Sequence, residues 1–154
     1  MTSASLNDET RTAFGVTHQT ACTQFVDVDR VRFAYRRFGH AQDRPLVMLQ
    51  HFRGNLDNWD PALTDAVARE REVILVDYPG VGSSGGEFGP TIADAARQMI
   101  AFLTSIGLEE IDLLGLSIGG FVAQEIALIR PTLIRRLILA ATGPKGRRHA
   151  RLAG

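Results

Sequence analysis

The sequence of 154 residues lacks a net charge, a long apolar run and a second cysteine. Because 17 basic residues balance 17 acidic ones, the charge predicts neither a nucleic-acid partner nor a membrane partner. No run of about 18 apolar residues indicates a transmembrane helix, and residues 1–20 lack the basic start and apolar block of a secretory signal. We therefore expect a cytoplasmic protein. The single cysteine, Cys22, can form no disulfide within the chain and is interpreted as a small strand residue.

What is present is the composition of one globular domain. Apolar residues make up 45% of the chain and charged residues 22%, and the length is sufficient to bury a core. No repeat or low-complexity segment interrupts the sequence. We predict a loose arm over residues 1–20, one domain over residues 21–144 and a basic tail over residues 145–154.

Apolar runs that are typical of strands alternate with helical patterns along the predicted domain. The short continuous runs 46–49 and 73–76 indicate strands that are covered on both faces. Asp29 and Arg30 separate the first two runs and indicate a hairpin turn. This alternation predicts an α/β fold with a doubly wound, mostly parallel sheet. The predicted strands span residues 22–28, 31–38, 46–49, 73–76, 111–114 and 133–141, and the predicted helices begin near residues 61, 91 and 118.

Capping residues and apolar spacing define the predicted helices. Asp60 before Pro61 is typical of an N-cap, and Thr91 with Asp94 forms a capping-box pattern. Helical spacing predicts buried residues on the first helix and on the last. They are Leu63, Val67 and Ala68 on the first, and Phe121, Val122 and Ile126 on the last.

A serine lies where a predicted strand turns sharply into a helix. Residues 115–120 (GLSIGG) follow the apolar run 111–114 and open a helical pattern. Glycines two residues to either side of Ser117 let the neighbouring backbone approach without a Cβ clash. Such a corner strains the serine backbone and presents its hydroxyl as a nucleophile. The alternative interpretation is an ordinary N-cap, for which serine is also well suited.

Two further segments follow strands at the same edge of the predicted sheet. Residues 51–55 (HFRGN) follow one buried strand and residues 77–84 (DYPGVGSS) follow the next. Open α/β sheets bind ligands at the carboxyl ends of their strands. In acyl transfer, two backbone N–H groups can stabilise the oxyanion that forms on the attacked carbonyl. The Ile118 N–H is one candidate donor, and the other belongs to the loop of residues 51–54.

These three motifs, in this order, resemble the N-terminal half of an α/β-hydrolase, close to the cofactor-free lactonase, esterase and non-haem haloperoxidase-like group. The resemblance runs from Phe25 to Gly143. It implies a truncated three-layer α/β/α fold of about six strands in the order 1-2-4-3-5-6, with the second strand antiparallel. The cap and the last two strands of the family are absent from this pattern.

The resemblance also implies roles for the residues at the sheet edge. Ser117 is the expected nucleophile, and the Ile118 N–H is the expected first oxyanion donor. The second donor is the N–H of Arg53 or of Phe52, and the resemblance favours Arg53. Phe52 occupies a position where the family more often has glycine. A serine at the corner argues against epoxide hydrolases and haloalkane dehalogenases, which carry aspartate there.

The acid and the histidine that complete the family's triad are not found in their usual places. The family order is serine, acid, histidine, and only 37 residues follow Ser117. Residues 142–145 (TGPK), where some members carry the acid, contain no carboxylate, and His149 in the basic tail is a remote candidate for the base. The apolar patterning ends after Gly146, which is the hint for a truncated or frameshifted chain.

Other polar residues are interpreted as structural. We expect His51 and Gly54 to support the oxyanion loop, and the Asp77 carboxylate to cap N–H groups of the glycine-rich loop rather than to act as an acid or base. His18 and His40 are expected on the surface. The Arg53 side chain could hold an anionic substrate group or simply face solvent.

A glycine pattern at residues 80–85 matches the dinucleotide-binding motif, but the next helix is delayed to about residue 91. We therefore expect no cofactor and no metal. The sequence predicts a hydrolase that acts on a small ester or lactone through an acyl-enzyme, weakened by the missing triad groups. The alternative is a non-catalytic fragment that acts at most as an interaction module. The apolar last strand also predicts aggregation or a homodimer through its uncovered edge.

Overall fold

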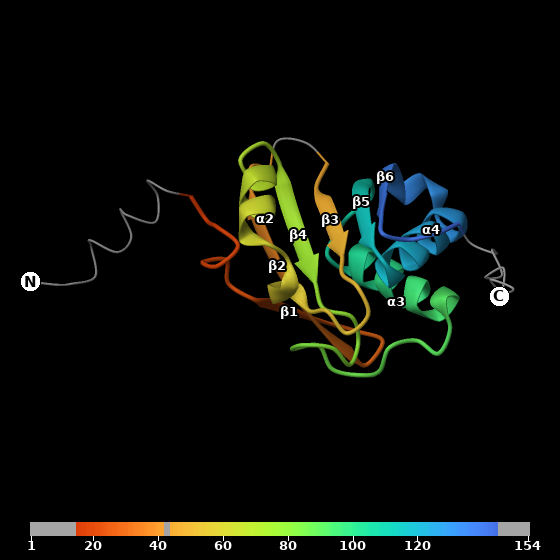
Figure 1. The fold of residues 1–154 in the computed structure, drawn as a ribbon. Helices are drawn as coiled ribbons and strands as arrows, with labels where there is room; N and C mark the ends of the chain where they lie inside the picture. Colours follow the sequence, from red (N-terminus) through yellow and green to blue (C-terminus); the bar gives the residue numbers. More distant parts are fainter. Residues whose placement is uncertain (1–14, 42–43, 145–154) are drawn as a thin grey trace, which may run out of the picture.

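The computed structural model describes residues 15–41 and 44–144, which form one six-stranded mixed sheet with helices on both faces (Figure 1). The strand order is β1-β2-β4-β3-β5-β6. β2 is antiparallel to β1 and β4, whereas β3, β4, β5 and β6 pair in parallel. The predicted α/β fold and its strand order are therefore confirmed. The strands are β1 (Gln24–Val28), β2 (Val31–Gly39), β3 (Leu46–Leu49), β4 (Glu72–Val76), β5 (Ile111–Leu116) and β6 (Ile134–Ala140).

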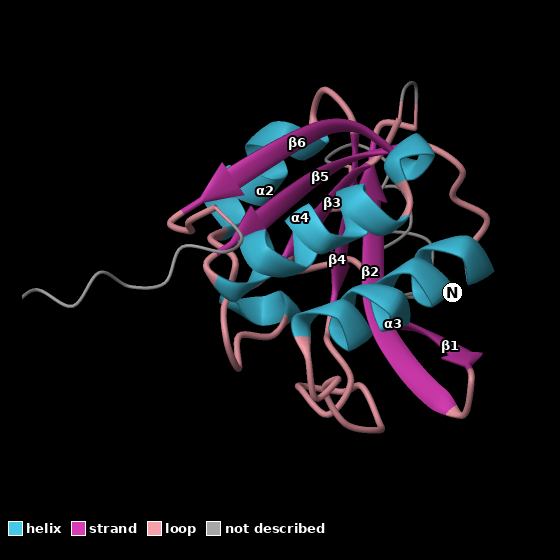
Figure 2. Ribbon diagram, turned by 90° about the vertical axis from the view of Figure 1, so that its right-hand side faces the viewer, coloured by secondary structure: helices cyan, strands magenta, loops and turns pink. Residues whose placement is uncertain are grey.

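Three α-helices in the described part of the chain form the outer layers. They are α2 (Pro61–Ala68), α3 (Ile92–Ser105) and α4 (Ile118–Ile129), and two short 3-10 turns, η1 (Leu56–Asn58) and η2 (Pro131–Leu133), accompany them. Figure 2 shows α3 and α4 in front of the sheet and α2 behind it. Asp60 and Thr91 cap α2 and α3 as predicted, each through a side-chain oxygen that accepts a backbone N–H of the first turn. None of the helices in the described ranges is long and apolar enough to cross a membrane.

The core lies in two layers, one on each face of the sheet. Phe102 of α3 and Ile126 of α4 pack with Leu49 and other sheet residues in the larger layer. The smaller layer contains Met48 and Trp59 beside α2. The strands β3 and β4 are buried along their whole length, as their continuous apolar runs predict. Burial on both faces fixes the carboxyl ends of these strands as a rigid platform.

Two helix residues that were predicted to face inward are exposed. The side chain of Leu63 is 47% exposed and that of Phe121 is 38% exposed. Thr64 and Ala68 form the buried face of α2, and Val122 and Ile126 form the buried face of α4. Successive helix residues differ by 100° about the axis, so a small rotation of a short helix moves one position out and its neighbour in.

His18 and Cys22 also differ from expectation. His18 is buried: its Nδ1 lies 2.9 Å from the Thr64 hydroxyl, and its ring meets Phe38 edge-on at 6.1 Å. The polar sequence around His18 gave no sign of this contact, because α2 supplies it from 46 residues away. Cys22 is exposed and lies before β1 rather than within a strand. His40 is exposed, as predicted.

Candidate active site

Ser117 joins β5 to α4 in a backbone conformation that side chains rarely adopt. Its φ is 56° and its ψ is −116°. A Cβ on Gly115 would lie 2.3 Å from the Gly119 carbonyl oxygen, and a Cβ on Gly119 would lie 2.4 Å from the Leu49 carbonyl oxygen. Only glycine fits at either position, because both contacts are with backbone atoms. The corner is therefore held tightly between β3, β5 and α4.

The Ser117 backbone, and not its hydroxyl, forms the hydrogen bonds that hold this corner. The Ser117 backbone N–H donates to Ala140 O and its carbonyl accepts from Gly120 N–H, both at 2.9 Å. The side chain is half-buried and makes no capping bond to α4. The ordinary N-cap interpretation of Ser117 therefore does not describe this geometry. A strained serine with an uncommitted hydroxyl has the features of a nucleophile.

The loop after β3 carries candidate donors for an oxyanion. Arg53 has a φ of 62°, and the turn is closed by a 3.0 Å bond from Gly54 N–H to His51 O. In the described part of the chain, the N–H groups of Phe52 and Arg53 have no hydrogen-bond acceptor. Ile118 is the first residue of α4, so its N–H has no acceptor within the helix. Three backbone donors thus remain available for an external oxygen.

His51 is bonded to its own loop. Its backbone N–H donates to the Gln50 side-chain oxygen, and its ring Nδ1 donates to the Phe52 carbonyl, both at 2.9 Å. The ring lies over Gly54, where an added Cβ would come within 2.9 Å of His51 Cε1. Because a carbonyl can only accept, Nδ1 is the donor in this contact.

Asp77 follows β4 and ties two loops together. Its carboxylate is 2% exposed and accepts from Leu56 N–H at 2.7 Å and from Ser83 N–H at 2.8 Å. Burial raises the pKa of Asp77, and the two N–H donors oppose this shift. The carboxylate thus fastens the glycine-rich loop and η1 beside the end of β4. Both of its oxygens are occupied by backbone partners.

A small pocket of about 280 Å³ brings the three predicted segments together. Its wall includes Phe52 and Arg53 from the first loop, residues 78–81 after β4, and Ile118 from the corner. Tyr78 is buried and its hydroxyl donates to Gln50 O at 3.3 Å. Burial also raises the pKa of Tyr78 far above its ordinary value, so the phenol stays neutral. The lining of this pocket is mostly apolar, and the pocket lies beside the candidate oxyanion donors.

Phe88 and Glu87 also line this pocket, and neither was predicted from the sequence. Phe88 meets Tyr78 edge-on with ring centroids 5.2 Å apart. A lone aromatic residue in a stretch otherwise rich in glycine and serine was the signal that could have identified it. The glycine loop folds back on itself through a 2.9 Å bond from Gly80 N–H to Gly85 O, and α3 begins only at Ile92. Its glycines therefore do not open a helix toward a nucleotide.

The described residues after β6 offer no acid or base that could complete a triad. Residues 141–144 (ATGP) contain no carboxylate, and His149 lies outside the described residues. Among the residues that the structure describes, no three His, Cys, Asp or Glu side chains gather as a metal site would require. The candidate groups of the described site are therefore Ser117 and the backbone N–H groups beside it.

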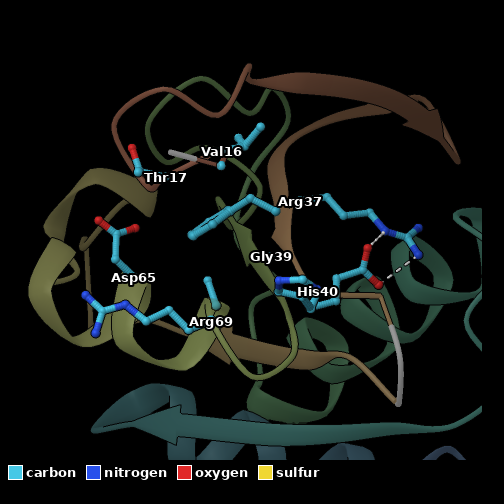
Figure 3. Close-up of a pocket in the computed structure, with 11 residues that line it drawn as sticks. Val16, Thr17, Arg37, Gly39, His40, Asp65 and Arg69 are labelled. Atoms are coloured by element: carbon cyan, nitrogen blue, oxygen red, sulfur yellow. Dashed lines mark hydrogen bonds and ion pairs between the residues drawn. The ribbon is translucent and has the colours of Figure 1, made fainter. Parts of the chain in front are cut away.

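A larger cavity of about 610 Å³ lies at the opposite end of the sheet (Figure 3). Gly39 and Glu72 on its wall mark the end of β2 and the start of β4, so the cavity is at the amino ends of the parallel strands. Arg37 donates two hydrogen bonds to the Glu72 carboxylate, at 2.5 and 3.0 Å, and dashed lines at Arg37 mark them in Figure 3. Because α/β sheets bind substrates at the carboxyl ends of their strands, this cavity is not the candidate active site.

Comparison with known proteins defines the class of this protein. The model of the family described as alpha/beta hydrolase fold matches residues 44–151. The chain belongs to this family, as the resemblance of its three motifs implied.

The chain spans less than half of the length of each of three similar proteins. A pimeloyl-[acyl-carrier protein] methyl ester esterase of Aeromonas hydrophila is 36% identical over 110 residues, which cover 70% of this chain and 41% of the esterase. The dihydrolipoyllysine-residue acetyltransferase component of the acetoin cleaving system of Cupriavidus necator is 35% identical over 127 residues, which cover 82% of this chain and 33% of that protein. An alpha/beta hydrolase fold protein from Chitinophaga pinensis superposes with a TM-score of 0.78 at 41% identity, covering 80% of this chain and 45% of that structure.

Proposed function

We propose that this chain is a serine hydrolase that attacks a small carboxylic ester or lactone and forms an acyl-enzyme. One observation carries the proposal: Ser117 is held at a φ of 56° with a hydroxyl that caps nothing, next to the pocket lined by Ile118. A serine that served only to begin α4 would use its oxygen to cap the helix. The proposal also places the chain in the cytoplasm, in keeping with its single cysteine.

The proposed chemistry proceeds in two steps. The Ser117 oxygen forms a bond to the substrate carbonyl carbon and passes its proton to solvent water, which later protonates the leaving oxygen, while the carbonyl oxygen becomes an anion that faces the N–H groups of Ile118 and Arg53. Collapse of this intermediate breaks the ester C–O bond, and the leaving oxygen takes up a proton. Water then attacks the acyl carbon and releases the acid and Ser117. In the alternative arrangement, the Phe52 N–H replaces that of Arg53.

The pocket supports an apolar group on the substrate. Phe52, Tyr78 and Phe88 contribute aromatic surface, and the neutral Tyr78 hydroxyl is engaged by Gln50 O. A similar protein that is named as a methyl ester esterase supports the choice of a carboxylic ester. The residues described after β6 offer no acid, so we expect slow turnover. Oxyanion stabilisation and binding alone leave a rate on the order of 10³ to 10⁴ above that in water.

Labelling with a fluorophosphonate tests this proposal. The wild-type chain should gain one covalent adduct by intact mass, whereas Ser117→Ala should gain none. Ser105→Ala is the matched control, because Ser105 lies at the end of α3 and bonds only Phe102 O. Labelling that persists in Ser117→Ala would show that the nucleophile is elsewhere.

The second candidate function is a non-catalytic chain that only binds a partner. Residues 141–144, which lack a carboxylate after β6, favour it. A folded wild-type chain that resists the fluorophosphonate at all concentrations would support this second candidate and contradict the first.

A further inference from the structure

A strap of residues 17–21 lies against α2 and the end of β2. The Thr17 carbonyl accepts from the N–H groups of Thr20 and Ala21, at 3.2 and 2.8 Å, and the Thr17 N–H donates to the Thr20 hydroxyl at 2.9 Å. These internal bonds make the strap a small local unit. Ala21 is buried and packs with Phe38 in the smaller core layer. The strap therefore covers part of that layer beside α2.

His18 makes every polar bond between the strap and the rest of residues 15–41 and 44–144. Its N–H donates to Asp65 at 2.7 Å, and its Nδ1 lies 2.9 Å from the Thr64 hydroxyl. Its carbonyl accepts from the Arg36 guanidinium at 3.4 Å. The attachment of the strap to α2 thus depends on one residue.

The surroundings of the His18 ring favour its neutral form. The ring is buried, and the Thr64 hydroxyl serves one of its two nitrogens. Among the described residues, none forms a hydrogen bond with the other nitrogen, Nε2. A protonated imidazole carries two N–H donors, so protonation would leave one donor unpaired beside the Phe38 ring.

Charged groups face His18 from three elements that pack around it. They are Arg36 of β2, Asp65 of α2 and Asp57 of η1. Burial lowers the pKa of His18 below its ordinary value of 6.5, Arg36 lowers it further, and the two carboxylates oppose the shift. Asp57 already pairs with Arg36 at 2.6 Å. The sum of these effects still disfavours a charged ring in this position.

The strap also borders the large cavity at the amino ends of the parallel strands. Thr17 contributes to the cavity wall together with Phe38 and Asp65. Figure 3 shows Thr17 and Asp65 on the same side of the cavity. Phe38 is only 4% exposed while the strap is in place. Movement of the strap away from α2 would widen the cavity and uncover this ring.

We infer that protonation of His18 releases the strap from α2, which makes the strap a pH-operated cover of the cavity and of Phe38. The neutral ring bonds Thr64 and holds the strap in place, whereas the charged ring is stabilised by water once the strap moves away. The equilibrium constant for release therefore rises as the pH falls below about 6.5, by up to about tenfold per pH unit. This inference does not depend on the chemistry of Ser117.

Thiol labelling of Ala21→Cys in a Cys22→Ser background measures the release in the full chain. At each pH the labelling rate is divided by that of the exposed Cys22 in the wild type, which corrects for ionisation of the thiol. We expect this ratio to rise at least about threefold from pH 7.5 to pH 5.5.

Two histidine variants in the Ala21→Cys and Cys22→Ser background identify the group responsible. His18→Asn places an amide near the position of Nδ1 and cannot become charged, so its ratio should not change with pH. His40→Asn is the matched control, because His40 is an exposed histidine on the wall of the same cavity, and its ratio should still rise.

A second buried position distinguishes release of the strap from unfolding of the whole chain. Ala96 of α3 is 0% exposed and lies in the other core layer, so the thiol of Ala96→Cys in the Cys22→Ser background should stay protected at pH 5.5. A pH-independent ratio for Ala21→Cys, an equal rise in His18→Asn, or equal labelling of Ala96→Cys would overturn the inference.

Discussion

At the scale of single residues, the site depends on positions where two backbone segments pack directly against each other. Gly119 lies in the first turn of α4, where an added Cβ would be 2.4 Å from Leu49 O and 2.8 Å from Gln50 O. Leu49 is the last residue of β3 and Gln50 follows it, directly before the loop that carries the candidate oxyanion donors. Any displacement of α4 there also moves Ser117 relative to Arg53.

Gly119→Ala should therefore affect both stability and reactivity. We expect a loss of about 1–3 kcal/mol in the free energy of unfolding from overpacking, together with a loss of fluorophosphonate labelling at Ser117. Urea denaturation and intact mass measure the two effects. Gly143→Ala is the control, since a Cβ there meets nothing within 4 Å, and it should change stability by no more than about 0.5 kcal/mol. Equal stability and labelling in both variants would contradict this account of the corner.

At the scale of elements, β5 carries chemistry of different kinds at its two ends. Ser117 directly follows the carboxyl end of β5, whereas Asp112 near the amino end of β5 is 1% exposed and bonds two arginines. Arg71 and Arg135 each approach an Asp112 carboxylate oxygen at 2.8 Å. Hydrogen bonds from Arg135 and then from Arg71 outweigh burial and lower the pKa of Asp112 from 3.8 to about 2. This cluster fastens β5 and β6 to the segment that precedes β4.

The stability contributed by Asp112 should depend on pH. A carboxyl whose pKa is lowered on folding stabilises the fold above its unfolded pKa and loses that contribution as pH falls to its folded pKa. Asp112→Asn should therefore be less stable than the wild type near pH 7, and the difference should shrink between about pH 4 and about pH 2. Thermal unfolding at a series of pH values measures it. A difference that stays constant over this interval would contradict the assignment.

The sequence predicted the existence of elements better than their orientation. Continuous apolar runs identified β3 and β4, and Asp60 and Thr91 identified the starts of α2 and α3, because these signals are local. The rotation of α2 could not be predicted, since Thr64 rather than Leu63 faces inward to meet His18. That contact joins residues far apart in the sequence.

For the candidate site, too, local features were predicted from the sequence and contacts between distant segments were not. The corner at Ser117 and the segments at 51–54 and 77–84 were found from spacing, and the structure brings Phe52, Arg53, Tyr78 and Ile118 to one pocket. Phe88 was missed because nothing in the local pattern shows that its loop returns to Tyr78. The order of the strands came from the resemblance to a family rather than from the residues themselves.

At the scale of the whole molecule, the candidate catalytic groups gather at one end of the sheet. A candidate nucleophile, candidate oxyanion donors and a pocket lie at the carboxyl ends of β3, β4 and β5. The chain matches 41% of a related esterase and 45% of a related structure. In the described residues, no carboxylate follows β6 to complete a triad. We therefore expect acylation of Ser117 to outpace release of the acyl group.

Mapping the acetyl group after reaction with p-nitrophenyl acetate tests this expectation most directly. The account predicts a burst of about one equivalent of p-nitrophenol, with one acetyl group on the peptide that contains Ser117, and no acetylated peptide from Ser117→Ala. Acetylation of a folded chain only at other residues, or release of p-nitrophenol at the same rate from Ser117→Ala, would contradict the claim that Ser117 is the nucleophile.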